Sequence, residues 1–236
     1  MVACAIVCAT ACTKRPQECQ AVIDTIDLDD QQIKDISARA TEDAKDLAPL
    51  VRQAAQLEEQ LVVKLGALQV ATKELADDVG EYVSFAKELS AAATAMADVL
   101  EQIATMKDRA DAVLASRDAA LDKLKVRCTA LPSLACRALD SATKPLDEIK
   151  DEDAYGEQAA KIDAVAARIA ALRLADGDLA REAEEYVKVL RSDAELLRDL
   201  GALTPKIGAS QGGLTSAMAK EQPVTDEINV LCIGHK

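Results

Sequence analysis

The sequence predicts an all-α protein, built as an elongated antiparallel helical bundle. Its 236 residues include 46 Ala and 27 Leu but only 2% aromatic side chains, which favours helices over a β-sandwich or barrel. Between residues 30 and 200, apolar side chains recur at alternating steps of three and four, as they do in helices that pack at shallow angles. Four such apolar stripes predict four long helices, and further short helices are expected near the chain ends.

Few residues interrupt these stripes. In the first stripe Pro49 predicts a kink, or a restart after Asp46, because proline removes a helical hydrogen bond. The second stripe predicts one helix over about 73–127 and is broken only by Arg117. Pro145 is expected to open or kink the third helix. The stripes cover residues 33–68, 75–124, 159–172 and 179–200, and a loose tail is expected over 201–236.

An internal repeat relates two of these segments. Residues 65–90 align without gaps to residues 169–194, and both copies contain Glu-Tyr-Val although the chain has only three tyrosines. We interpret the repeat as two related helical hairpins, which turn near residues 71 and 176. Both turns are expected at one end of the bundle, with the turn at 128–136 at the other end. Convergence of one amphipathic pattern is the alternative explanation.

The N-terminal residues 1–12, MVACAIVCATAC, are uncharged. They are too few to cross a membrane, which needs about 20 helical residues, and they match the apolar core of a secretory signal, although no basic segment precedes them. Residues 9–12, Ala-Thr-Ala-Cys, are similar to a lipobox. A buried first helix, or an apolar tail with incidental cysteines, is the alternative.

With CQAVIDTID at 19–27 and EINVLC at 227–232, the chain resembles the uncharacterised helical lipoproteins of bacterial envelopes. The resemblance implies a signal segment over 1–11, lipidation of Cys12, and an anchor and spacer over 12–18. One bundle domain, 19–236, would then face an extracytoplasmic space. Thr13 after Cys12 is consistent with outer-membrane sorting in such proteins.

Processing of this kind would leave four cysteines, which allow three disulfide connectivities. We favour Cys128–Cys136, which flanks a seven-residue turn containing Pro132, and Cys19–Cys232. The second pair is favoured because the segments 19–26 and 228–232 carry cysteine and isoleucine at mirrored helical spacings. Four buried, reduced thiols in a cytosolic protein are the alternative.

The composition argues against several functions. The only histidine is residue 235, so no nucleophile–base pair is expected and we predict that the protein is not an enzyme. The net charge of −13 without a basic cluster argues against nucleic-acid binding. Runs of carboxylates are interpreted as solvated helix faces, so no metal site and no cofactor are expected. Tyr82 and Tyr186 lie on the apolar stripes and are markers of the core or of an interaction layer.

These observations predict a non-enzymatic structural or protein-interaction module. It would contact the membrane through its N-terminal lipid, in the cell envelope, and bind a protein partner whose identity the sequence does not give. One alternative is a cytoplasmic coiled-coil adaptor with reduced thiols. Another is a carrier or sensor of a small apolar ligand between the helices, which a dry core volume would favour.

Overall fold

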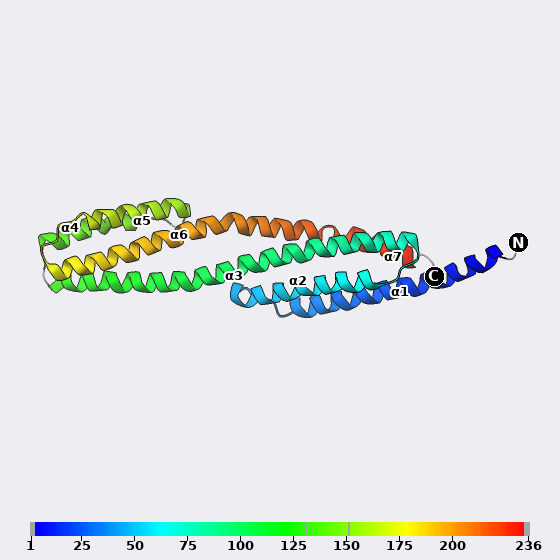
Figure 1. Cartoon of the computed structure of the whole chain (residues 1–236). Helices are drawn as coiled ribbons and strands as arrows, with labels where there is room; N and C mark the ends of the chain where they lie inside the picture. The colour runs from blue at the N-terminus through cyan, green and yellow to red at the C-terminus, as the bar shows by residue number, and fades with distance from the viewer. Residues whose placement is uncertain (1–2, 131, 151, 234–236) are drawn as a thin grey trace. The chain divides into compact units, whose positions relative to one another are not determined.

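A computed structural model describes residues 3–130, 132–150 and 152–233, and side chains are described from residue 15 to residue 232 with the same gaps. The predicted all-α class is confirmed, since the described residues form helices and short connections and include no strand. The elements are α1 (Ala3–Ser37), α2 (Ala44–Ala67), α3 (Lys73–Ala130), α4 (Leu134–Thr143), the 3-10 helix η1 (Lys144–Glu148), α5 (Tyr155–Ala170), α6 (Gly177–Met218) and α7 (Glu221–Ile233) (Figure 1).

The helices form two compact units, where the sequence analysis expected one bundle domain over 19–236. Unit 1 consists of residues 1–101 and 207–236, and unit 2 of residues 102–206. The chain passes from one unit to the other within α3 and again within α6. Because helices of this length continue through the boundary without a turn, the apolar stripes alone do not mark it.

In unit 1, α1 packs against α2, and α2 turns into the antiparallel α3 (Figure 1). Its core combines Leu61 and Leu65 of α2 with Leu75 and Val79 of α3, and α1 and α7 add Val22, Ile26 and Ile228. These side chains are at most 7% exposed. Burial of an aliphatic side chain contributes roughly 1.5–3 kcal/mol, so unit 1 is held mainly by this layer.

In unit 2, α5 turns into the antiparallel α6 and packs with α4 and the second half of α3 (Figure 1). Arg127, near the end of α3, forms ion pairs with Asp178 (3.6 Å) and Glu182 (2.7 Å) at the start of α6. The turn before α6 therefore lies beside the 128–136 turn. The expectation that these two turns lie at opposite ends was wrong.

The structure reproduces the repeat and extends it toward the N-terminus. Helix α3 begins at residue 73 and α6 at residue 177, which is the same offset of 104 as in the sequence alignment. The two hairpins bury corresponding residues, including Ala55 and Ala159, Glu58 and Ile162, Leu61 and Val165, Leu65 and Ile169, Leu75 and Leu179, and Tyr82 and Tyr186.

Two predicted boundaries were wrong. The first stripe is interrupted at residues 38–43, where Asp43 accepts a hydrogen bond from the Lys45 backbone N–H and caps α2, whereas Pro49 lies inside that helix. Most of the expected loose tail is helical within the described residues 201–233, since α6 continues through Pro205 to Met218 and α7 follows. No described helix is long and apolar enough to cross a membrane.

Candidate functional site

The disulfide Cys19–Cys232 joins α1 to α7 in unit 1. The two Cα atoms are 5.4 Å apart, and Cys19 packs in the same core as Ile26 and Ile228. This is the pair that the mirrored spacing favoured. The spacing misplaced one residue, however, because α1 buries Val22 completely and leaves Ile23 partly exposed. We call this end of unit 1, where α1 and α7 are linked, the clasp.

Arg15 adds polar contacts at the clasp. Its guanidinium donates a hydrogen bond to the Leu231 carbonyl of α7 (3.4 Å) and lies 3.8 Å from the Glu74 carboxylate of α3. One side chain of α1 therefore contacts both α7 and α3. The clasp combines a covalent link, an apolar layer and these two polar contacts.

The second disulfide, Cys128–Cys136, closes the turn between α3 and α4 in unit 2, with the Cα atoms 5.5 Å apart. The Ser133 side chain caps α4 by accepting a hydrogen bond from the Cys136 backbone N–H (3.2 Å). The predicted pair and the helix cap thus constrain the same short turn. Cys12, the predicted lipidation residue, precedes residue 15 and lies outside the part of the chain whose side chains are described.

Tyr82 and Tyr186 occupy equivalent core positions in the two hairpins. They are 2% and 1% exposed, and burial raises the pKa of both phenols. Tyr82 packs edge-on against Phe85, with ring centroids 5.5 Å apart. The sequence predicted that these tyrosines mark either the core or an interaction layer. Both tyrosines lie in the core.

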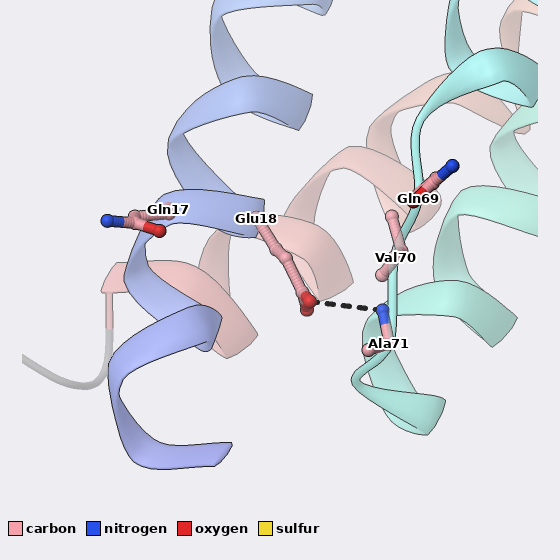
Figure 2. Close-up of a pocket in the computed structure, with 5 residues that line it drawn as sticks. All are labelled: Gln17, Glu18, Gln69, Val70 and Ala71. Carbon is pink, nitrogen blue, oxygen red and sulfur yellow. Dashed lines mark hydrogen bonds between the residues drawn. The ribbon is translucent and has the colours of Figure 1, made fainter. Parts of the chain in front are cut away.

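Unit 1 contains a groove of about 370 Å³, lined by Gln17, Glu18, Gln69, Val70 and Ala71, which are drawn in Figure 2. The Glu18 carboxylate points from α1 toward the α2–α3 loop and accepts hydrogen bonds from the backbone N–H groups of Ala71 (3.0 Å) and Thr72 (3.1 Å). These N–H groups precede α3 and have no partner within the helix. The groove therefore holds an internal contact that fixes the loop on α1.

Unit 1 also buries two carboxylates that the sequence analysis missed. Asp29 of α1 is 1% exposed and Glu58 of α2 is 5% exposed, and each has a carboxylate oxygen without a hydrogen-bond partner among the described residues. Burial, reinforced by Asp29 and Glu221, raises the pKa of Glu58 to about 8. The sequence did contain an indication of their burial, because Asp29 follows the core residue Ile26 by three positions and Glu58 precedes Leu61 by three.

The buried carboxylate of unit 2 has a different environment. Asp193 of α6 is 5% exposed, and it accepts a hydrogen bond from the Arg117 guanidinium of α3 at 2.8 Å. Arg117 is the residue that interrupts the second apolar stripe. The Arg117 guanidinium therefore supplies the positive charge that the buried Asp193 carboxylate needs as a partner.

The described residues contain no group of three or more His, Cys, Asp or Glu side chains arranged to hold a metal ion. Comparison of the chain with protein-family models, curated proteins and solved structures finds no match. The buried carboxylates and the clasp are therefore interpreted from their geometry alone.

Proposed function

We propose that this protein is a non-enzymatic helical module, anchored by a lipid on Cys12 in an extracytoplasmic space of the cell envelope, with a structural or protein-interaction role. The observation that carries the proposal is the cysteine pairing. Two disulfides use the four cysteines from residue 19 onward and leave Cys12 outside both pairs. Structural disulfides persist in oxidising compartments, which supports an exported protein.

The position of Cys12 also suits an anchor. It precedes Cys19 by seven residues, so a lipid there would be attached close in sequence to the clasp. Stable anchoring needs more than one acyl chain, and a processed lipoprotein carries several. The anchor would thus act on α1, the helix that the Cys19–Cys232 bond ties to α7.

The role as a structural module is supported by ion pairs that cross between helices on exposed surfaces. In unit 1, Arg52 of α2 contacts Asp98 (2.7 Å) and Glu101 (2.8 Å) of α3. In unit 2, Arg109 of α3 contacts Asp199 of α6 at 2.6 Å. Exposed pairs of this kind contribute little to stability, because water screens them, but they join neighbouring helices at defined positions.

The proposal is tested by the intact mass of the protein from its native host, alkylated without and then with reduction. We expect loss of residues 1–11, a lipid mass on Cys12, and alkylation of the other cysteines only after reduction. A full-length chain whose thiols are alkylated at once would contradict both the anchor and the oxidising compartment. It would favour the cytoplasmic adaptor instead.

Two variants make the assignment specific to one residue. Cys12→Ser is expected to abolish the lipid mass and to move the protein from the membrane fraction to the soluble fraction. Cys8→Ser is the matched control and is expected to leave both unchanged, because Cys8 would be removed with the signal segment. Retention of the lipid in Cys12→Ser would reassign the anchor.

A further inference from the structure

The buried acids of unit 1 form a cluster with three unpartnered acceptor atoms. These are Oδ1 of Asp29, Oε1 of Gln32 and Oε2 of Glu58, from two adjoining helices. Burying an ionised carboxylate without a partner is strongly unfavourable, whereas a protonated carboxyl becomes a hydrogen-bond donor. Protons on the carboxyl groups of the cluster would supply donors for these unpartnered oxygens.

The charged groups that face Glu58 are nearly all acidic. From α1 they are Asp29 and Asp30, and from α7 Glu221, while α3 contributes the uncharged phenol of Tyr82. The cation that acts on the cluster is Lys64 of α2, which faces Asp29 from an exposed position, while Lys34 of α1 faces Asp30.

The cation next to the start of α7 is paired elsewhere. Lys220, which precedes α7, pairs with Glu88 of α3, and the last part of α6 in unit 1, residues 207–218, contains no ionisable side chain. Ionisation of the cluster would thus place several negative charges between α1, α2 and the first turn of α7.

We propose that Asp29, Glu58 and Glu221 form a proton-dependent latch that holds the first turn of α7 on α1 and α2. With protons bound, the carboxyl groups are neutral and donate hydrogen bonds to the unpartnered oxygens of the cluster. When the carboxyl groups ionise, the negative charges repel one another and must be hydrated, and this part of α7 loosens. The Cys19–Cys232 bond retains the other end of the helix, so the change is local and reversible.

The pH range follows from the direction of the shifts. The pKa values of Asp29, Asp30 and Glu221 are raised, in each case mainly by burial, and that of Glu58 is raised to about 8. The Glu58 carboxyl has a higher pKa in the folded state than its unfolded-state value of 4.5. It therefore makes its full contribution to folding stability at pH values below 4.5. That contribution is lost as the pH rises through about 8, so the latch opens on the alkaline side.

The test measures amide hydrogen exchange of α7, corrected for the intrinsic pH dependence, in the full-length oxidised protein with EDTA present. Between pH 5 and pH 8.5 we expect protection over residues 221–228 to fall at least tenfold, while protection over residues 155–170 of α5 stays constant. In Glu58→Gln the fall in α7 protection over this range should be much smaller, because only Asp29 and Glu221 of the latch can still ionise. Glu59→Gln, which alters the exposed neighbouring acid, is the matched control and should respond like the wild type.

Three outcomes would overturn the proposal. The first is a wild-type α7 whose protection is the same at both pH values. The second is a Glu58→Gln variant that keeps the wild-type response; if this variant does not fold, Glu221→Gln takes its place. The third is recovery of α7 protection at pH 8.5 on addition of Ca²⁺ alone, which would make the cluster a divalent-cation site. The test does not require a lipid on the protein, so its result is independent of whether the proposed lipid anchor exists.

Discussion

The hairpins α2–α3 and α5–α6 share their spacing, their loop position and their buried tyrosines, yet at one matched core position an ionisable residue stands in place of an apolar one. The second hairpin has Ile162, which is 4% exposed, where the first has Glu58, which is 5% exposed. Each unit also contains a buried aspartate, but Asp193 is paired with Arg117 whereas Asp29 has an unpartnered oxygen. The comparison teaches that one packing scheme accommodates either a neutral or an ionisable core.

The difference has an energetic consequence. An apolar residue at the matched position stabilises the second hairpin at every pH, because its burial does not depend on protonation. Glu58 is compatible with burial only while it carries its proton, so the first hairpin is expected to lose stability as the pH rises toward 8. The two units should therefore respond differently to the same change in pH.

The largest expected effect separates the two disulfides. Replacing Cys19 and Cys232 by Ser removes a link across 213 residues, which by chain entropy costs about 5 kcal/mol of unfolding free energy before native strain is subtracted. Replacing Cys128 and Cys136 by Ser opens a link across 8 residues and costs about 2.5 kcal/mol. Urea unfolding followed by circular dichroism measures both. Equal losses would indicate that loop length does not govern their contributions.

The second prediction makes the second hairpin resemble the first. Ile162→Glu should lower the unfolding free energy by about 4 kcal/mol at pH 8 and by less at pH 4, because the buried carboxyl is then protonated. Ala160→Glu adds the same charge at an exposed position of α5 and is the control, with a change under about 0.5 kcal/mol expected. A loss in Ile162→Glu that is the same at both pH values would mean that the site admits water.

The third prediction removes the partner of the buried acid in unit 2. Arg117→Met leaves Asp193 buried without its guanidinium and should cost about 3 kcal/mol at pH 8. Adding Asp193→Leu to Arg117→Met is expected to restore much of the stability, since a buried pair can be replaced by apolar residues. Unfolding curves of the single and double variants test this, and a further loss in the double variant would contradict it.

The smallest effect concerns the first hairpin and has the opposite sign. Glu58→Ile should raise the unfolding free energy by about 2 kcal/mol at pH 9 and leave it nearly unchanged at pH 4. The sign follows because the variant removes a group whose raised pKa destabilises the folded state only above its unfolded value. Thermal unfolding midpoints across this pH range measure the effect. A midpoint that falls at pH 9 would show that Glu58 has a stabilising partner when ionised.

Much of the fold follows from the pattern of residues along the chain. The start of α3 and the turns near 71 and 176 were predicted because amphipathic spacing and the repeat both encode them locally. The break before α2 was placed wrongly because Pro49 was interpreted as its cause. The connection ends instead at the Asp43 cap, six residues before Pro49. The helical tail was missed because proline and glycines lower helix propensity.

The candidate site was much less predictable. Asp29 and Glu58 lie at stripe spacing, but an acid at such a position is usually solvated, and only the neighbouring helices decide whether water reaches it. Arg117 was noticed as an interruption, yet its partner Asp193 is 76 residues away in the sequence, and no local spacing connects them.

The sequence by itself determined the helical class, the two related hairpins and the spacing of the cysteines, because each of these depends on residues within a few helical turns. Only the tertiary structure decided that the chain divides into two units, and that three helices enclose Glu58 and Asp29 while one oxygen of each has no hydrogen-bond partner among the described residues. Burial is a property of what surrounds a side chain, and those neighbours come from distant parts of the chain.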